Sequence, residues 1–578
     1  MARPAAMQRD RLSGKTGAGL DPCACLQVRF ALDEAEEKET AFMFGAGKDL
    51  DEARAILQRF NGTASIRREL ENVWEYWKRN LGVVYVETPD ESLNFLVNGW
   101  LQYQTIACRL WGRSGYYQSG GAFGYRDQLQ DVMSLMHSHP EMVREQLVAF
   151  AARQFVEGDV QHWWHPPSGR GIRSNCSDDY LWLPFVACLY VGEIGDTGVL
   201  DEKISFLDGP QVKPGEESYY GLPGISDKTG TLYEHCVAAV KRSLKFGVHG
   251  LPLMGSGDWN DGMNLVGREG KGESVWLAFF LHQVLDSMEK IAGARGDAAF
   301  SGMCHDEAEK LSRNIDENGW DGDWYRRAYY DSGEAIGSSS SEECRIDSVP
   351  QSWAVITGVA GPERARKAMD QVDMRLVDRE NSLIKIFEPP FDKSVSDPGY
   401  IKGYVPGVRE NGGQYTHAAI WTVIAFAALK DKKRAWELFN MINPVNHSDS
   451  PEKCGVYKVE PYVMAADIYT AKSNNGRGGW TWYTGSASWM YQLIVKYLLG
   501  IRLKVDRIFF EPCLPEAWQS FKIHYRYRET FYHIHIKRSG PGDTVASVTL
   551  DGELRDDKAL PLADDRLEHD AEVIIGQV

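Results

Sequence analysis

The sequence predicts a mainly α-helical protein, an (α/α)6 barrel with a partial β-sandwich before it and a small β domain after it. About twelve segments between residues 89 and 500 place apolar residues three or four positions apart, as helices do. These segments alternate between more apolar and more amphipathic ones, which suits paired inner and outer helices. After Gly500 the apolar residues alternate with polar ones, which is typical of strands.

The N-terminal part predicts strands followed by a helical linker. Over residues 20–47, "LQVRFAL" alternates, and "ETAFMFGAG" follows the charged turn "DEAEEKE". We therefore expect residues 1–49 to hold two or three strands. Residues 50–85 contain "DLDEARAILQRF" and "IRRELENVWEYWKRNL", whose apolar spacing indicates two amphipathic linker helices.

The predicted barrel spans residues 86–500 and the predicted C-terminal β-layer spans residues 501–578. The helical segments include "YLWLPFVACLYVGEIG", "SVWLAFFLHQVLDSMEKIAG", "THAAIWTVIAFAAL", "KKRAWELFNMI" and "PYVMAADIYT". The β-layer is predicted from "KVDRIFFEP", "SFKIHYRYRETFYHIHIKRS", "DTVASVTLDG" and "DAEVIIGQV", with "RET" and "SGPGD" as turns.

Charge and composition exclude several classes of function. The formal net charge of -17 opposes binding to nucleic acid or to an anionic membrane surface. No stretch approaches the roughly 20 apolar residues of a membrane span, and the basic start lacks the apolar core of a secretory signal. Ten cysteines are scattered, and only Cys23 and Cys25 are close together. We expect reduced thiols in a cytoplasmic protein, with no metal site and no cofactor.

Aromatic residues gather in polar, glycine-rich stretches. The chain holds 18 Trp and 26 Tyr, many of them in "QHWWHPPSGRG" and "RGGWTWYTGSASWMY". Such rings offer a flat apolar face and a hydrogen-bonding edge, which complement the C–H faces and hydroxyl rim of a sugar. Mixed with Arg, Asp, Gln and Asn, they predict a carbohydrate-binding cleft.

Six polar clusters fall between the predicted helices, where a barrel would bring them together at one end. They are "GGAFGYRDQLQD", "SNCSDDYLWLP", "GSGDWNDGMN", "SEECRIDSVPQSW", "RENGGQYTH" and "GRGGWTWYTGS". The third cluster, residues 255–264, is interpreted either as a tight turn or as a catalytic loop that holds a carboxyl group beside an aromatic ring.

These motifs together resemble the inverting phosphorylases of glycoside hydrolase family 94. Three segments are most similar in sequence to the branch that contains cyclic β-1,2-glucan synthases and 1,2-β-oligoglucan phosphorylases. They are "GAGLDPCACLQV", "CRLWGRSGYYQSGGAFGYRDQLQD" and "NPVNH". The resemblance implies a β-sandwich, a helical linker, an (α/α)6 barrel and a C-terminal β-layer. It also implies homodimers or inclusion in a larger synthase, with a β-glucan and inorganic phosphate as substrates.

By this resemblance, Asp261 is the catalytic acid that protonates the departing glycosidic oxygen. A phosphorylase needs no second carboxylate as base, because phosphate is already an anionic nucleophile. Trp259 would be the platform under the leaving sugar, while Asp258 braces the turn.

The resemblance also assigns the phosphate site to His417, Thr484 and Gly485. Phosphate needs hydrogen-bond donors and positive charge, and the helix that begins at Ser486 favours an anion at its start. The family's extra arginine before "GYRD" and a glutamine near "VMAAD" are both missing here. Arg113 or Arg477 would then supply the missing charge.

Arg126 and Asp127 match the family's pair that binds the sugar at the cleaved bond; a structural ion pair is the alternative interpretation. Asp178, Asp179 and Gln351 lie in matching loops and are expected to line the cleft. Glu410 stands where a hydrolase would place its base, and is interpreted as a sugar ligand or a brace.

Three functions remain open at this point. The first is phosphorolysis of a β-glucoside, in particular a β-1,2-glucan, to α-D-glucose 1-phosphate. The second is an inverting β-glucan hydrolase, and the third is a non-catalytic glucan-binding module that controls chain length in a synthase. Because two or three strands cannot close a sandwich, we also expect poor solubility, a missing upstream partner segment, or a truncated gene product.

Overall fold

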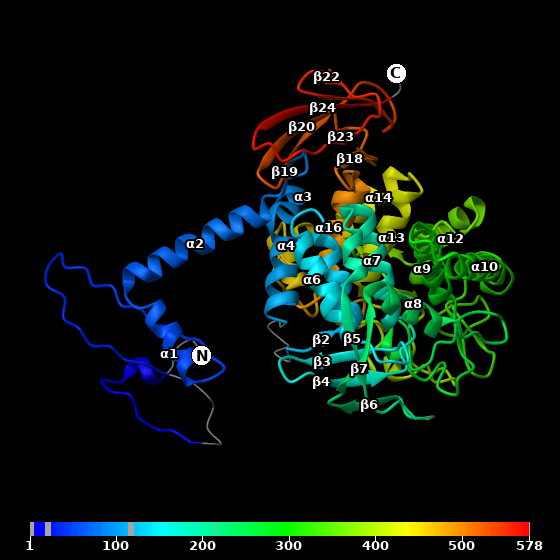
Figure 1. Cartoon of the computed structure of the whole chain (residues 1–578), viewed down its shortest axis with the longest axis horizontal. Coiled ribbons are helices and arrows are strands. Elements are labelled where there is room, and N and C mark those ends of the chain that lie inside the picture. The colour runs from blue at the N-terminus through cyan, green and yellow to red at the C-terminus, as the bar shows by residue number, and fades with distance from the viewer. Residues whose placement is uncertain (1–4, 18–24, 114–120, 214, 577–578) are drawn as a thin grey trace. The chain divides into compact units, whose positions relative to one another are not determined.

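The computed structural model describes residues 5–17, 25–113, 121–213 and 215–576. Cys23 and the tyrosines of "SGYYQSG" lie outside these residues. The chain divides into two compact units, Met1–Lys78 and Arg79–Val578, and each is described by itself (Figure 1).

The regular secondary structure described in the first unit is helical. It contains the 3-10 turn Ala5–Gln8, α1 (Leu50–Arg59) and most of α2 (Thr63–Leu81). Asp49 caps α1, because its carboxylate accepts a hydrogen bond from the backbone N–H of Glu52. The strands predicted over residues 20–47 are not formed in the described residues 25–47. A strand exists only when its N–H and C=O groups pair with a neighbour, and alternation in "LQVRFAL" supplies no such neighbour.

Six buried helices of the second unit form a closed ring among the described residues. Each contacts the next, and the last contacts the first. In chain order they are α5 (Tyr125–Val132), α7 (Trp182–Ile194), α9 (Val275–Ala294), α11 (Ser348–Ile356), α13 (Thr416–Ala428) and α16 (Ser486–Gln492). Their apolar composition explains the burial: in α13 every residue from Thr416 to Ala427 is buried.

Amphipathic helices pack on the outside of this ring, for example α10 on α9, α12 on α11 and α14 on α13. In α12 the buried residues Ala365, Ala368, Met369 and Val372 recur every three or four positions. The helices outside the ring are α3 (Glu91–Phe95), α4 (Leu101–Tyr103), α6 (Pro140–Ala151), α8 (Leu232–Ser243), α10 (Ala298–Asn314), α12 (Pro362–Arg375), α14 (Lys432–Ile442) and α15 (Pro451–Tyr457).

Two elements differ from the sequence prediction. Helix α5 lies in "GGAFGYRDQLQD", which was expected to be a loop because its residues are mostly polar. Four of its buried side chains are nevertheless polar: they are Arg126, Gln128, Gln130 and Asp131. Side chains from other segments of the chain form hydrogen bonds with Arg126, Gln130 and Asp131 inside the ring. In contrast, "PYVMAADIYT" forms no helix: Asp467 and Ile468 pair with Gln414–Tyr415 instead.

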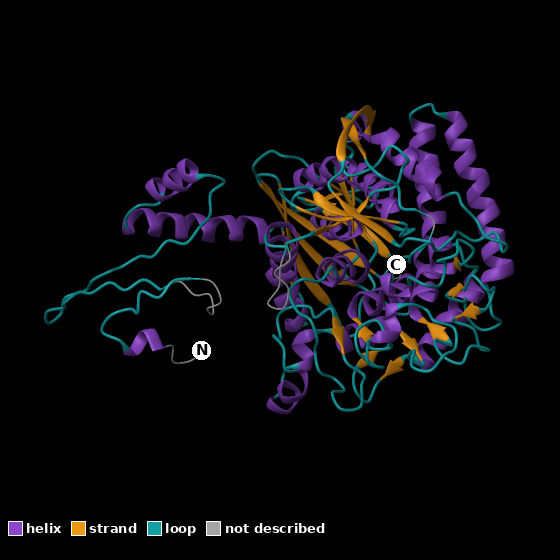
Figure 2. Cartoon of the chain, turned by 90° about the horizontal axis from the view of Figure 1, so that it is seen from below, coloured by secondary structure: helices purple, strands orange, loops and turns teal. Residues whose placement is uncertain are grey.

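The period-two pattern after Gly500 is confirmed as a six-stranded sheet in the order β1-β19-β20-β24-β21-β22. Its strands are β1 (Val84–Glu87), β19 (Ser520–Tyr527), β20 (Thr530–Arg538), β21 (Val545–Leu550), β22 (Glu553–Leu554) and β24 (Glu568–Ile575). Strand β1 comes from the start of the second unit and pairs antiparallel with β19, so the sheet joins both ends of that unit. Figure 2 shows these long strands in orange among the purple helices.

The remaining strands form smaller sheets or pairs, most of them in the segments between helices. They are β2 (Phe123–Gly124), β3 (Gln161–His165), β4 (Arg170–Ser174), β5 (Lys203–Asp208), β6 (Ser218–Gly221), β7 (Gly224–Thr231), β8 (Glu273–Ser274), β9 (Ala328–Tyr329), β10 (Ala335–Ile336), β11 (Ile346–Asp347), β12 (Val377–Asp378), β13 (Leu383–Ile384), β14 (Phe387–Glu388), β15 (Gln414–Tyr415), β16 (Asp467–Ile468), β17 (Ile501–Lys504), β18 (Arg507–Phe510) and β23 (Leu560–Pro561). Within the described residues, none of the helices has the length and apolar character needed to cross a bilayer.

Candidate active site

The loop "GSGDWNDGMN" makes a tight turn whose shape depends on glycine. Gly255 and Gly257 have φ angles of 63° and 125°, values that other residues rarely adopt. A Cβ on Gly255 would lie 2.2 Å from the backbone oxygen of Asn175, so only glycine fits there. The Asn260 side chain then caps the short turn Asp261–Met263 by accepting from Gly262 N–H. The loop is therefore a turn that also fixes the direction of Asp261.

Asp258 anchors this loop from beneath, as the sequence predicts. It is fully buried, and both of its oxygens accept hydrogen bonds from Arg327 at 2.6 Å. Ser274 donates to Asp258 Oδ2 at 2.7 Å. Burial alone would raise the pKa of Asp258, but the Arg327 guanidinium more than offsets this and the pKa lies below its usual value.

Arg126, in the first turn of α5, connects two carboxylates and a backbone carbonyl group. Its Nη2 donates to Asp261 Oδ1 at 2.5 Å, and its Nη1 donates to Asp178 Oδ1 at 2.9 Å. Nη1 also donates to the backbone oxygen of Asp258 at 2.8 Å. Asp178 is completely buried and also accepts from the Trp182 indole N–H. Asp178 therefore orients Arg126 from behind.

His162, on β3, is a site residue that sequence reasoning missed. Its Nδ1 lies 2.7 Å from Asp179 Oδ2, and its Nε2 lies 3.8 Å from Asp261 Oδ2. Burial would lower the pKa of His162, but the two carboxylates outweigh burial and raise it to about 9. The side chain is then an imidazolium at neutral pH. Its only sequence signal was a histidine inside the aromatic cluster "QHWWHPP".

A pocket of about 330 Å³ opens over these side chains. Arg126, Asp127, His162, Asp261 and Tyr400 all line it. Asp178 and Asp179 were expected to line the cleft, but they lie behind Arg126 and His162 and are not among the lining residues. They hold these two cations in place, because buried carboxylates need paired charge.

The residues predicted to bind phosphate form a second cluster. A Cβ on Gly485 would lie 3.3 Å from Cε1 and 3.5 Å from Nδ1 of His417, so glycine allows the close approach. Thr484 Oγ1 is 2.8 Å from Ser486 Oγ, at the start of α16. The structure thus brings His417, Thr484 and Gly485 together, although none of them lines the described pocket around Asp261.

The tautomer of His417 follows from its neighbours. The Trp489 indole N–H donates to Gln130 Oε1 at 3.0 Å, which makes that oxygen an acceptor. His417 Nε2 lies 3.1 Å from the same oxygen and must therefore carry the proton. Burial lowers the pKa of His417 to about 3, so the ring is neutral. Its Nδ1, which faces Gly485, carries no proton. It can accept a hydrogen bond from the hydroxyl group of a partly protonated anion.

Arg109 is a buried arginine beside this cluster, which the sequence did not single out; the sequence had pointed to Arg113 or Arg477 for the missing charge. Arg109 Nε donates to Asp131 at 2.7 Å, and the guanidinium lies over the Tyr483 ring. Asp131 in turn lies 3.5 Å from a Cβ placed on Gly485. The Nη2 of Arg109 is buried without a hydrogen-bond partner among the described residues. A charged residue in the apolar run "TIACRLW" was the only signal for it.

Asp127 and Trp259 connect the two clusters. Asp127 lines the pocket with Asp261, and its Oδ1 lies 3.5 Å from Arg109 Nη2. Burial would raise the pKa of Asp127, but Arg109 and Arg126 lower it below its usual value, so the carboxylate is charged. Trp259, predicted to be the platform under the leaving sugar, is 8% exposed and packs against His417 at 5.2 Å between centroids. Its ring thus links the catalytic loop to the phosphate cluster.

Other predicted residues have different roles. Gln351 is fully buried, and its amide bonds to the backbone of Tyr325 and Asp347, so its predicted sugar contact is not supported. Arg113 lies over the Phe123 ring, and Arg477 is exposed; neither lines the pocket. Glu410 is half-enclosed beside Arg409, and burial raises its pKa.

The arrangement combines a carboxyl group that can donate a proton with a second cluster that can bind an oxyanion. Asp261 is the carboxyl group that enters the pocket beside two cations, and the second cluster offers the donors that an oxyanion needs. His162, Cys176 and Asp261 are close enough to share a metal ion. Arg126 donates to both Cys176 and Asp261, however, so a guanidinium already provides the positive charge there.

Comparison with known proteins agrees with this chemistry. Residues 76–500 match the model of the glycosyl hydrolase 94 superfamily catalytic domain. Residues 1–63 match the glycosyl hydrolase 94 supersandwich domain. The second match covers the segment whose described residues 25–47 form no strand.

Three curated relatives illustrate the range of similar proteins. A cyclic beta-(1,2)-glucan synthase, NdvB, from Rhizobium meliloti is 43% identical over 95% of this chain, which spans only 19% of that protein. An N,N'-diacetylchitobiose phosphorylase from Vibrio proteolyticus is 29% identical over 95% of this chain and 69% of its own length. A 1,2-beta-oligoglucan phosphorylase from Listeria innocua is 24% identical over 76% of this chain and 41% of its own length.

Proposed function

Because this chain belongs to the glycosyl hydrolase 94 superfamily, we propose that it is an inverting glycoside phosphorylase. In the proposed reaction, the Asp261 carboxyl gives its proton to the glycosidic oxygen as the bond from that oxygen to the anomeric carbon breaks. A phosphate oxygen forms the new bond to the anomeric carbon from the opposite face. A β-glucoside then yields α-D-glucose 1-phosphate, and the proton of hydrogen phosphate restores Asp261.

The position of Asp127 carries this proposal. Its carboxylate lies in the pocket with Asp261 and also 3.5 Å from Arg109, beside the His417 cluster. A sugar held on Asp127 and Arg126 would have the acid on one side and the oxyanion donors on the other. This is the geometry that inversion requires.

The finer assignments are parts of the same proposal. The similarity to a cyclic beta-(1,2)-glucan synthase and to a 1,2-beta-oligoglucan phosphorylase supports a β-1,2-glucan as substrate. The closed ring of helices with amphipathic helices outside it supports an (α/α)6 barrel. Nine free thiols in the described residues support the cytoplasm as location. A homodimer or a place within a longer synthase follows from the family alone.

A β-glucan hydrolase is the second candidate, because Glu410 could act as its base. One Glu410 oxygen, Oε2, is buried without a hydrogen-bond partner among the described residues. Tyr400 interacts electrostatically with both Asp261 and Glu410, which places the two carboxyl groups near one ring.

The test incubates the protein with β-1,2-, β-1,3- and β-1,4-linked glucose oligomers, with and without inorganic phosphate. We expect glucose 1-phosphate only when phosphate is present, and most of it from the β-1,2 series. Asp261→Asn should lower kcat about 10²–10⁴-fold, because it removes the proton donor. Asp306→Asn, on the exposed surface of α10, is the matched control.

Two outcomes would contradict the proposal. Release of free glucose without phosphate, abolished by Glu410→Gln, would identify a hydrolase. Oligomer binding by calorimetry without turnover of any kind would identify a non-catalytic glucan-binding module.

A further inference from the structure

A second pocket adjoins the proposed active site. Its volume is about 420 Å³, within the range of about 300–1,000 Å³ that small-molecule sites occupy. Three residues, Ser174, Glu217 and Ser256, line both this pocket and the one that holds Asp261. The two hollows are therefore neighbours with a shared wall.

The loop that carries Asp261 forms part of the shared wall through Ser256. Gly255 and Ser256 at the start of the loop and Asn264 at its end line the second pocket. Asp261, in the middle of the loop, faces the first pocket. A ligand in the second pocket would thus contact both ends of the loop that carries the proton donor.

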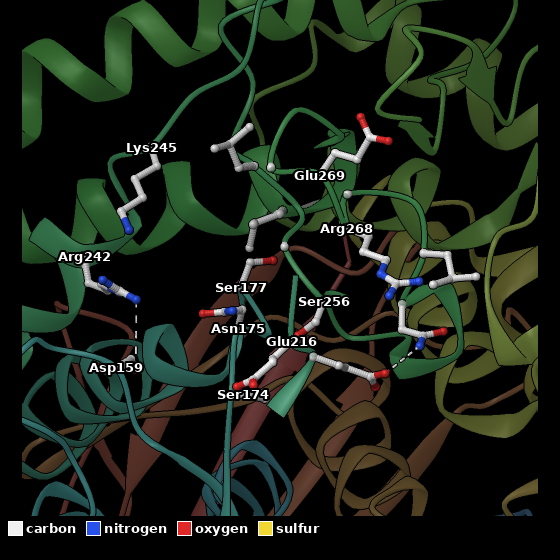
Figure 3. A pocket seen from close by; sticks show the side chains of 18 of the residues that line it. Asp159, Ser174, Asn175, Ser177, Glu216, Arg242, Lys245, Ser256, Arg268 and Glu269 are labelled. Atoms are coloured by element: carbon white, nitrogen blue, oxygen red, sulfur yellow. Dashed lines mark hydrogen bonds and ion pairs between the residues drawn. The ribbon is translucent and has the colours of Figure 1, made fainter. Parts of the chain in front are cut away.

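The lining is polar and contains groups without partners. Figure 3 shows Lys245 and Arg268 on opposite sides, with Asn175, Ser177 and Ser256 between them. In the described part of the chain, the side chains of Lys245, Arg268 and Asn175 have no hydrogen bond or ion pair. Ser256 Oγ is buried and also unpartnered. Lys245 and Arg268 are exposed, whereas Asn175 is half-buried, and the unpaired polar groups of all four residues are free to bind a ligand.

The charges of the lining favour a neutral polyol over an anion. Arg242, Lys245 and Arg268 are balanced by Asp159, Glu216, Glu217 and Glu269. Asp159 already accepts from Arg173 at 2.6 Å, and Glu217 accepts from Asn264 at 2.9 Å. The amide, hydroxyl and cationic groups that remain can donate to and accept from sugar hydroxyls, which do both.

We propose that this pocket binds the leaving side of a longer glucan chain and makes the enzyme prefer such chains. The inference rests on the proposed function, because Asp261 protonates the leaving oxygen and the leaving chain therefore lies on the Asp261 side. From there, the chain passes over Ser256 and Glu217 into the second pocket. A disaccharide fills only the first pocket.

The test compares the variant Lys245→Met/Arg268→Met with the wild type on β-1,2-linked oligomers of two and of five glucose units. We expect kcat/KM on the pentamer to fall about tenfold more than kcat/KM on the dimer, since two hydrogen bonds to charged groups are lost. Lys433→Met/Arg313→Met, with the same changes on α14 and α10, should leave the ratio between the two substrates unchanged.

Calorimetric titration with the pentamer, without phosphate, gives a readout that does not depend on turnover. The dissociation constant should rise about tenfold in Lys245→Met/Arg268→Met. Asn175→Ala, which removes an unpartnered amide, should weaken binding in the same direction. The melting temperatures of all variants show whether they are folded.

Three results would overturn the inference. The first is an equal loss of kcat/KM on dimer and pentamer. The second is a dissociation constant for the pentamer that the variants do not change. The third is a raised KM for phosphate at both chain lengths. The last would mark the two cations as an anion site. If the wild type makes no glucose 1-phosphate, the proposed function fails while the titration still decides whether the pocket binds the chain.

Discussion

His162 places a positive charge beside the proposed catalytic acid. It faces Asp179, Asp261 and Arg126, and the two carboxylates raise its pKa from 6.5 to about 9 against the effect of burial. A raised histidine pKa stabilises the folded state fully below pH 6.5, and this contribution is lost as the pH rises through 9. At 1.36 kcal/mol per pKa unit, the contribution is about 3 kcal/mol.

We therefore predict that His162→Asn flattens part of the pH dependence of stability. The free energy of unfolding of the wild type, relative to His162→Asn, should decline by up to about 3 kcal/mol between pH 6.5 and 9.5. Denaturant unfolding at four pH values in this interval measures the difference, in which groups common to both proteins cancel. A constant difference across the interval would show that His162 is uncharged in the folded protein.

At the level of residues, the sequence predicted groups that carry chemistry better than groups that position them. Arg126, Asp127 and Asp261 line one pocket, and they could be singled out because they belong to motifs with a recognisable pattern. Arg109 and His162 were missed because each acts through neighbours distant in the chain. Arg109 and Asp131 are 22 residues apart, and His162 and Asp179 are 17 apart.

The loop that carries Asp258 and Asp261 is held by a buried ion cluster. Arg327 donates to Asp258 through two bonds of 2.6 Å, and its Nε lies 3.2 Å from Asp347 Oδ2. All three side chains are at most 1% exposed. Removing one partner of a buried ion pair leaves an uncompensated charge and costs about 3–5 kcal/mol.

Arg327→Met is expected to destabilise the protein by about 3–5 kcal/mol and to reduce activity by loosening the loop. Arg327→Met/Asp258→Asn should recover part of this loss, because one of the two unpaired carboxylates is gone. Denaturant unfolding measures the stability, and Arg313→Met on exposed α10 is the control. A double variant no more stable than the single one would show that Asp258 is not what Arg327 compensates.

Helices were predictable from the sequence where their buried side chains are apolar. Helices α9, α13 and α14 follow the expected segments because each apolar stripe packs on another helix. Helix α5 escaped prediction since its buried face includes polar side chains whose hydrogen-bond partners lie in other segments of the chain. The segment around Asp467 misled for the opposite reason: its apolar residues are buried by strand pairing rather than by helix packing.

At the scale of the whole molecule, strand β1 connects the two ends of the second unit. Val84 pairs with Tyr525 and Val86 pairs with Ile523, and both valines are 1% exposed. The Asn98 amide also bonds to both the N–H and the C=O of Val86 at 2.8 Å. A strand next to the ring helices therefore completes a sheet built from residues more than 400 positions later. Alternation in four residues could not predict that pairing, because register depends on the distant partner.

Two truncations test whether β1 belongs to the fold of the second unit. Removing residues 1–78 should leave a protein with one sharp melting transition, because residues 79–578 form a compact unit by themselves. Removing residues 1–88 also deletes β1 and uncovers the edge of β19. Burial of two valines is worth about 3–6 kcal/mol, so the shorter fragment should melt at a lower temperature. Calorimetry of both fragments measures the difference; equal melting temperatures would mean that β1 adds nothing to the stability of the sheet.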